Sequence, residues 1–225
     1  MEFSKYKRTA HLDWSEGVQS DDKIILPEHL SLFEGKEVVA SEKMDGENST
    51  LYTNYTHARS LDSKHNFTRD WLKKMHSVIR HDLFEGWRYV GENMWGEHSI
   101  RYDDGVLEGY FYLFAIFDDN NTLISYDDTV EIANMLDLPM PKVFYRGVFD
   151  TRAIMDMTKN LDLTKTEGYV LRLADAVEQD QNSDFLRGVA KFVRKGHVQE
   201  NAEHWLKNVQ RNGNLSERVK PFFMS

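Results

Sequence analysis

The chain has 225 residues, of which 40% are hydrophobic and 29% are charged, a composition that excludes a disordered or collagen-like protein. Its 28 Lys and Arg residues against 37 Asp and Glu residues give a formal charge of -9, so a nucleic acid can bind only at a local basic patch. Cysteine is absent, which excludes disulfides, thiolate metal sites and cysteine nucleophiles.

The sequence has no apolar run of about 18 residues, the length that a membrane span requires, and no apolar signal core follows Met1. We therefore expect a cytoplasmic protein without membrane contact, in the host cytoplasm if the chain is viral. No Pro-rich or Gly-rich linker and no repeat interrupts the sequence. This continuity predicts that residues 1–225 form a single domain.

Strand-like patterns recur along the chain. Runs rich in Val, Tyr, Phe and Thr predict strands at Glu37–Glu42, Ser49–Tyr55, Arg88–Gly91, Gly109–Asp118, Gly168–Leu173 and Gly188–Val193. The polar residues Asp118–Asn121 predict a hairpin turn into a further strand at 122–125.

Helical spacing of apolar residues occurs in three stretches. It predicts helices over 68–81 with Thr68 as its cap, over 129–138 ending before Pro139, and near 198–210. The first helix would bury a stripe formed by Trp71, Leu72, Met75, Val78 and Ile79. Because strands and helices do not alternate regularly, the sequence favours an α+β domain of mainly antiparallel sheets with flanking helices over a doubly wound fold.

Common phosphate-binding loops and the Gly-x-Ser-x-Gly elbow are absent from the sequence. Instead, Lys43 follows the first predicted strand within Glu42-Lys43-Met44-Asp45-Gly46. A lysine where a strand enters a turn can be held rigidly and desolvated, which lowers its pKa toward that of a nucleophilic amine. For this motif alone, a surface ion pair at a hairpin turn is the more common interpretation.

Glu92 and Phe114 are the next candidates. Glu92 follows the predicted strand 88–91, where it can hold a ribose hydroxyl or a metal-bound water, or simply be exposed at the strand end. In the aromatic run 112–117, strand alternation predicts that Tyr112, Phe114 and Ile116 share one face. Phe114 could stack there on a purine ring, and core packing is the alternative.

Two later motifs place charge in apolar strands. Glu167 precedes the predicted strand 168–173, and Lys191 lies within the predicted strand 188–193. Burying such charges is costly unless a partner or ligand is present. Two cations and two carboxylates that converge on one pocket would suit a nucleotide and a divalent metal, whereas solvated strand faces are the alternative.

The order of these motifs resembles that of the covalent nucleotidyltransferase superfamily of ligases and capping enzymes. The resemblance covers residues 43–195 and rests on Lys-x-Asp-Gly, Gly-Glu, the aromatic run, Glu-Gly-x-Val-x-Arg and Ala-Lys-x-Val in this sequence. Within this superfamily, the sequence most resembles the RNA ligases related to phage T4 RNA ligase 2, because Asn48 and His57-Ala58-Arg59-Ser60 match the motifs of that branch. The resemblance implies an ATP-grasp-like nucleotidyltransferase domain and a minimal one-domain ATP-dependent RNA ligase.

The resemblance also implies a role for each matching residue. Lys43 would attack the α-phosphate of ATP and carry AMP as a covalent intermediate. Nucleotide binding would involve Glu42, Asn48, Arg59, Glu92 on the ribose, Phe114 on the adenine and Lys191 at the α-phosphate. Asp45 and Glu167 would hold the metal through water, and Arg59, Arg194 and Lys195 would contact RNA.

The implied cofactors are ATP and Mg²⁺, with Mn²⁺ as a substitute, and the implied substrates are RNA strands with 5'-phosphate and 3'-hydroxyl ends. Attack requires an unprotonated amine, whereas a free lysine has a pKa of about 10.4. We expect Lys191, Arg59 and the metal to disfavour the Lys43 ammonium and so to lower its pKa.

The sequence departs from the family pattern in two respects. Val193 stands where the pattern has a second lysine, so either Arg194 or Lys195 substitutes or this contact is missing. The short stretch after Lys195 has no room for an OB domain, so we expect a partner protein or a local basic strip to supply RNA-binding surface. Candidates for the strip are Lys5, Lys7, Arg8, Arg69, Lys73, Lys74, Arg194, Lys195 and His197.

Two alternatives to an RNA ligase remain open. An ATP-dependent ligase of DNA or mixed-strand nicks would use the same covalent chemistry. A nucleotide-binding or RNA-binding module that has lost ligation would explain Val193 and the short C-terminal stretch.

Overall fold

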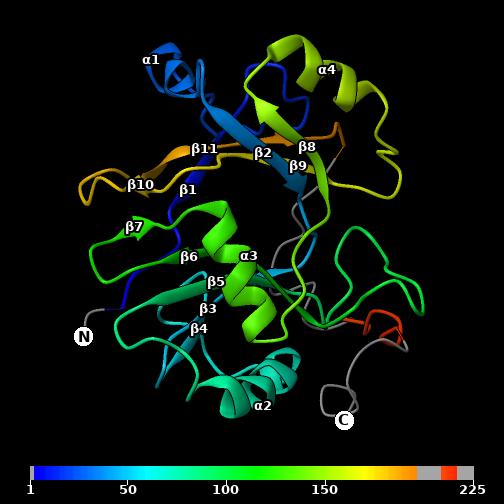
Figure 1. Cartoon of the computed structure of the whole chain (residues 1–225). Coiled ribbons are helices and arrows are strands. Elements are labelled where there is room, and N and C mark those ends of the chain that lie inside the picture. The colour runs from blue at the N-terminus through cyan, green and yellow to red at the C-terminus, as the bar shows by residue number, and fades with distance from the viewer. Residues whose placement is uncertain (1–2, 197–208, 217–225) are drawn as a thin grey trace.

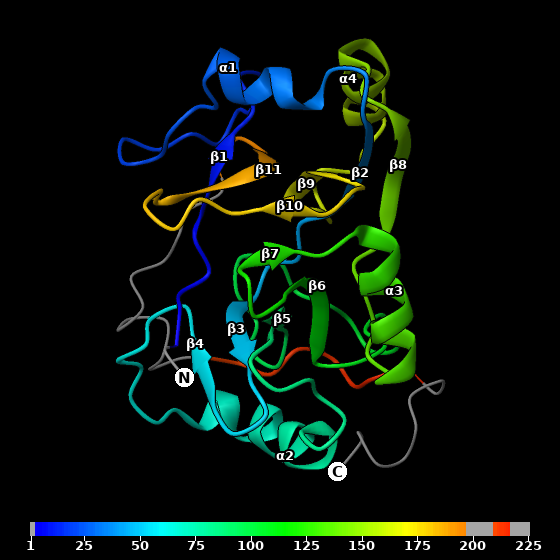
Figure 2. The same cartoon turned by 60° about the vertical axis from the view of Figure 1, so that its left-hand side comes forward.

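The computed structural model describes residues 3–196 and 209–216, and its strands form two sheets that face each other. Helices cover the outer sides of both sheets (Figures 1 and 2). The predicted α+β class with mainly antiparallel sheets is confirmed. Among the described residues, no helix is long and apolar enough to cross a bilayer. The helix predicted near 198–210 lies almost entirely outside the described residues.

The first sheet has the strand order β1-β11-β9-β2-β8. The strands are β1 (Arg8–His11), β2 (Glu37–Glu42), β8 (Val143–Val148), β9 (Gly168–Leu173) and β11 (Phe185–Val193). All pairs are antiparallel except β1 with β11, which is parallel. Alternate residues such as Ala40 and Leu171 form a core with the region of α1 (Pro27–Leu30) and α4 (Thr151–Lys159), so the residues between them face the second sheet.

The second sheet has the strand order β10-β7-β6-β5-β3-β4. The strands are β3 (Glu47–Leu51), β4 (Thr56–Ala58), β5 (Arg88–Asn93), β6 (Phe111–Phe117), β7 (Thr122–Leu123) and β10 (Val177–Glu178). Helices α2 (Asp70–Ile79) and α3 (Tyr126–Met135) pack on one face through a core that includes Leu72, Leu113 and Ala133. The opposite face is therefore turned toward the first sheet (Figure 2).

The helix predicted over 68–81 is shorter than expected. A 3₁₀ turn, Phe67–Arg69, precedes α2, and Asn66 rather than Thr68 caps it, because the Asn66 side chain accepts the Thr68 backbone N–H at 3.1 Å. Val78 is 42% exposed, so its place on the buried stripe is wrong. His76 is buried instead, with Nε2 2.6 Å from the Tyr52 carbonyl oxygen.

Other element boundaries also shift for local reasons. The strand predicted at Ser49–Tyr55 ends at Leu51, because the Tyr52 N–H donates to the Tyr55 carbonyl and turns the chain into β4. The helix predicted at 129–138 begins at Tyr126, because the Ser125 side chain accepts the Asp128 N–H at 3.0 Å. No sequence pattern had indicated β1, β8 or α4.

Candidate active site

A cleft of about 490 Å³ lies between the inner faces of the two sheets. The chain crosses from β2 to β3 at residues 43–46, and this crossing forms part of the wall. Nine of the eleven residues predicted for the site line the cleft: Glu42, Lys43, Asp45, Asn48, Arg59, Glu92, Phe114, Glu167 and Lys191. Motifs from both ends of the chain therefore meet in one place.

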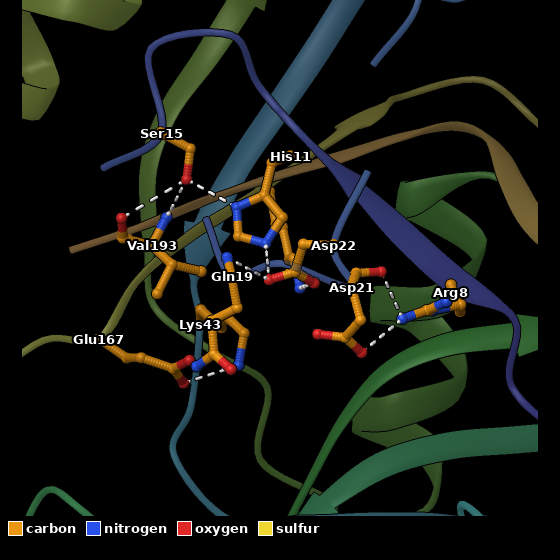
Figure 3. A network of polar contacts seen from close by, with 10 residues as sticks. Arg8, His11, Ser15, Gln19, Asp21, Asp22, Lys43, Glu167 and Val193 are labelled. Atoms are coloured by element: carbon orange, nitrogen blue, oxygen red, sulfur yellow. Dashed lines mark hydrogen bonds and ion pairs between the residues drawn. The ribbon is translucent and has the colours of Figure 1, made fainter. Parts of the chain in front are cut away.

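Lys43 and Glu167 form an ion pair in the cleft, with Nζ 2.6 Å from Oε2 (Figure 3). Glu167 is only 2% exposed, and the Lys43 side chain is 26% exposed. Burial lowers the pKa of Lys43, but Glu167, Glu92 and Asp45 together outweigh it and raise that pKa above the usual 10.5. The predicted lowering by Arg59 and Lys191 is wrong for this arrangement, because carboxylates dominate the surroundings of the amine.

Glu92, at the inner end of β5, adds a further carboxyl group to this cluster. Its Oε1 accepts the Gly46 N–H at 3.3 Å. Burial raises the pKa of Glu92 to about 8, although Lys43 acts in the opposite direction. The site therefore concentrates acidic groups around one ammonium, a charge distribution that an additional cation would balance.

Phe114 faces the cleft because of a β-bulge. Val90 pairs with Ala115 and Gly91 with Leu113, which leaves Phe114 without a partner on β5. The bulge interrupts alternation, so Ile116 lies in the core below α2 and α3, and the prediction that Tyr112, Phe114 and Ile116 share one face is wrong. The Tyr6 ring packs edge-on against Phe114, with centroids 5.4 Å apart.

Comparison with protein families identifies the relatives of this chain. A family model described as RNA ligase matches residues 36–193, which include every predicted site residue except Arg194 and Lys195. The chain belongs to the RNA ligase family. No curated protein sequence matches it.

Solved structures share the fold of this RNA ligase family member at low sequence identity. An archaeal ATP-dependent RNA ligase has a TM-score of 0.56 at 14% identity, with 85% of this chain and 48% of that chain covered. A Naegleria gruberi RNA ligase variant solved with ATP and Mn has a TM-score of 0.52 at 16% identity, covering 91% and 61%. A candidate ATP-dependent DNA ligase from Aquifex aeolicus has a TM-score of 0.54 at 15% identity, covering 85% and 50%. The chain thus spans about half to three fifths of these proteins.

Two carboxylates of the cleft, Asp45 and Glu167, have the chemistry to bind a divalent metal. Asp45 is 6% exposed, and its Oδ2 accepts the Ser99 hydroxyl at 2.8 Å and the Ile100 N–H at 2.6 Å. Among the described residues, no group of three or more His, Asp or Glu side chains is close enough to hold a metal by itself. Mg²⁺ is commonly bound by one or two carboxylates, water and substrate phosphates, and Glu167 with Asp45 fits that mode.

Asn48 and Arg59 both present polar groups to the cleft. Asn48 Oδ1 is buried and has no hydrogen-bond partner among the described residues, so it can accept a hydrogen bond from a ligand. Arg59 directly follows β4 and is exposed. Its guanidinium is therefore available at the edge of the cleft.

Arg194 and Lys195 do not line the cleft. Val193, at the position of the expected second lysine, is 3% exposed and is covered by the chain around Ser15 and Gly17. The Arg194 backbone N–H donates to the Glu167 carbonyl at 2.9 Å, which links the end of β11 to the start of β9.

Several cleft residues had no predicted role in nucleotide chemistry. Tyr6 and Thr9 come from the N-terminal segment, where no sequence signal indicated them. Arg69 was expected only as part of a basic strip, and it holds Glu47 through Nε to Oε2 at 2.7 Å and Nη2 to Oε1 at 2.5 Å. Arg172, noted only as the last residue of its motif, is 4% exposed and donates through Nη2 to the Ile124 carbonyl at 2.5 Å, which ties the two sheets together.

Proposed function

We propose that this chain is an ATP-dependent RNA ligase that forms a covalent Lys43–AMP intermediate. The observation that carries the proposal is the position of Lys43: its amine lies in a cleft between two sheets, 2.6 Å from a buried carboxylate, with Lys191 and Arg59 on the same walls. Membership of the RNA ligase family supports this assignment. The archaeal and Naegleria proteins of the same fold are described as RNA ligases, and the latter was solved with ATP and Mn.

In the first step, neutral Lys43 Nζ would attack the α-phosphorus of ATP. A nitrogen–phosphorus bond forms, the bond to the pyrophosphate oxygen breaks, and pyrophosphate leaves. Lys191 would offset the charge on the transferring phosphate, and Phe114 would stack on the base. Because Glu167 and its neighbours raise the pKa of Lys43, the Lys43 ammonium must lose a proton before its nitrogen can attack.

In the second step, an oxygen of the RNA 5'-phosphate would attack the AMP phosphorus and release Lys43, which regains its proton. In the third step, the RNA 3'-hydroxyl would attack the activated 5'-phosphate, and AMP leaves as the phosphodiester forms. Asp45 and Glu167 would hold a divalent cation, either Mg²⁺ or Mn²⁺, through water; the cation supplies charge stabilisation for the phosphates. Arg59, Arg194 and Lys195 would bind RNA, and a partner protein would extend that surface.

The first experiment is intact-mass analysis after incubation with ATP and Mg²⁺, followed by peptide mapping. We expect one AMP on Lys43 in the wild type and none in Lys43→Ala. Lys7→Ala is the matched control, because Lys7 is another lysine of the cleft wall and should leave the Lys43 adduct intact. An adduct on another residue, or none from folded protein, would refute the proposal.

Polynucleotide preference is tested separately by sealing nicked duplexes that carry 5'-phosphate and 3'-hydroxyl ends. Sealing of RNA in preference to DNA supports the proposed substrate. Preferential sealing of DNA would reassign the substrate while retaining the Lys43 chemistry. Nucleotide binding without any adduct would indicate a binding module that has lost ligation.

A further inference from the structure

A carboxylate from the N-terminal segment faces Lys191, which lines the cleft (Figure 3 shows its surroundings). Asp22 follows β1 in the chain, and its Oδ1 lies 3.5 Å from Lys191 Nζ. The two side chains are 21% and 17% exposed, so this is a largely buried ion pair. Burial opposes ionisation of Asp22, but the Gln19 N–H and Lys191 hold its pKa below the usual value.

His11 lies beside the other oxygen of this carboxylate. Parallel pairing places His11 of β1 opposite Lys191 of β11, and His11 Nε2 lies 3.1 Å from Asp22 Oδ2. His11 is 1% exposed, and burial together with Lys191 lowers its pKa to about 4. The imidazole is therefore neutral near pH 7, with Nε2 beside the Asp22 carboxylate and Nδ1 beside the Ser15 hydroxyl.

Ser15 anchors the imidazole to β11. Its Oγ lies 2.8 Å from His11 Nδ1 and accepts the Val193 N–H at 2.9 Å (Figure 3). These contacts engage the hydroxyl on both sides, so Ser15 is a structural link rather than a nucleophile. A chain of contacts thus runs from the backbone of β11 at Val193 through Ser15, His11 and Asp22 back to Lys191.

This chain of contacts places a carboxylate where it stabilises the largely buried Lys191 ammonium. Burial and the like charge of Lys43 both lower the pKa of Lys191, whereas Asp22 and Glu167 act in the opposite direction. Among the described residues, Glu167 pairs with Lys43 at 2.6 Å and Asp22 pairs with Lys191 at 3.5 Å. Lysine also has four rotatable side-chain bonds, so an ordered partner restricts where its charge points.

We propose that Asp22 is a positioning residue for Lys191: flanked by His11, its carboxylate orients the Lys191 ammonium in the cleft before the nucleotide binds. The inference rests on the proposed function, since Lys191 is the group assigned to the α-phosphate. A pre-oriented cation accelerates phosphoryl transfer by placement, because no reorganisation is then needed during the reaction. Before binding, the same carboxylate opposes an incoming anion, so Asp22 favours the reaction step rather than affinity.

The test compares Asp22→Asn with Asp21→Asn. Asp21 is the adjacent residue, its side chain is 76% exposed, and it pairs with Arg8 at 3.0 Å, so its substitution removes the same charge without touching Lys191. Two quantities are measured: the single-turnover rate of Lys43 adenylylation at saturating ATP, and the affinity for α,β-methylene ATP, which cannot transfer AMP. Thermal melting of each variant establishes that it is folded at the assay temperature.

We expect Asp22→Asn to lower the adenylylation rate about tenfold while the affinity is unchanged or rises, and Asp21→Asn to match the wild type. Asp22→Glu should recover part of the rate. In a Lys191→Met background, the substitution Asp22→Asn should have no effect on the residual rate, because Asp22 acts through Lys191. If that residual rate is too low to measure, the affinity for α,β-methylene ATP in the same background replaces it, and Asp22→Asn should not lower that affinity.

An Asp22→Asn rate equal to that of Asp21→Asn would overturn the proposal. Equal losses of rate and affinity that persist in the Lys191→Met background would indicate a merely structural role and would also overturn it. Failure of the proposed function has a different signature, because the wild type would then form no Lys43 adduct at all. In that case the affinity measurements alone decide whether Asp22 and Lys191 are coupled in nucleotide binding.

Discussion

The Lys43–Glu167 pair makes a measurable prediction about the protonation of Lys43. Glu167→Gln removes the buried charge but retains the shape and a hydrogen-bonding oxygen. At 2.6 Å and an effective dielectric constant of about 20, Coulomb's law gives on the order of 6 kcal/mol as an upper bound. Opposite charges at this range shift pKa values by about one to three units, or about 1.4 to 4 kcal/mol. We therefore expect the pKa of Lys43 to fall by at least about one unit.

Competitive acetylation measures this shift, because trace acetic anhydride reacts only with neutral amines. The extent of labelling at Lys43 is obtained by peptide mass spectrometry and normalised to an exposed lysine such as Lys159. At pH 9, Glu167→Gln should label at least about tenfold faster at Lys43 than the wild type.

Glu42→Gln provides the matched control for this experiment. Glu42 precedes Lys43 and lines the same cleft, but the carboxylates that raise the Lys43 pKa are Glu167, Glu92 and Asp45. Labelling in the control should therefore stay close to that of the wild type. Equal labelling of Lys43 in Glu167→Gln and Glu42→Gln would refute the reasoning, since Glu167 would then not hold the proton on the amine.

Three further changes test the cleft. Glu92→Gln should leave unfolding almost unchanged near pH 4.5 and stabilise the protein by on the order of 4 kcal/mol at pH 8. The reason is that Glu92 has a pKa of about 8 in the folded protein and ionises more readily in the unfolded chain. Equal melting temperatures of the wild type and the variant at both pH values would contradict this reasoning. Phe114→Ala should weaken ATP binding by about 1 kcal/mol through lost stacking, and an unchanged affinity in calorimetry would remove Phe114 from the base-binding surface. Gly168→Ala should lower the urea midpoint strongly, because φ is +154° and a Cβ would lie 1.9 Å from the Phe192 carbonyl oxygen. Gly147→Ala, whose Cβ would meet the end of the Tyr145 side chain with its nearest atom at 3.2 Å, should have a much smaller effect on the same midpoint.

The parts of the site that could be predicted from sequence are those carried by short motifs. Lys43, Glu92 and Glu167 each adjoin a strand whose composition is distinctive, so both the strand and the charged residue were identified. Phe114 was identified for its chemistry, but its orientation depends on a bulge that strand alternation alone does not reveal.

The remaining parts depend on long-range pairing that a sequence pattern does not encode. Asp22 and His11 reach Lys191 only because β1 pairs with β11. His11 and Asp22 precede the residues that match the family model, and Lys191 lies near the end of that match. The protonation of Lys43 was mispredicted for a similar reason, because the three carboxylates around it come from separate parts of the chain. The burial of Lys43 and the charges around it are determined only when these parts of the chain come together in the fold.

The pairing of β1 with β11 also has a consequence for biosynthesis. Arg8–His11 emerges from the ribosome early, but Phe185–Val193, its neighbour in the sheet, is made only after most of the described chain. Until then β1 has no partner on that side, so Tyr6 cannot take its place in the cleft and Asp22 cannot pair with Lys191. The second sheet, from β3 to β7, and strands β2, β8 and β9 of the first can pair during translation, whereas the β1 side of the first sheet must wait for β11. A nascent chain of this protein should therefore acquire nucleotide affinity in a single late event, close to the moment when residue 193 leaves the exit tunnel.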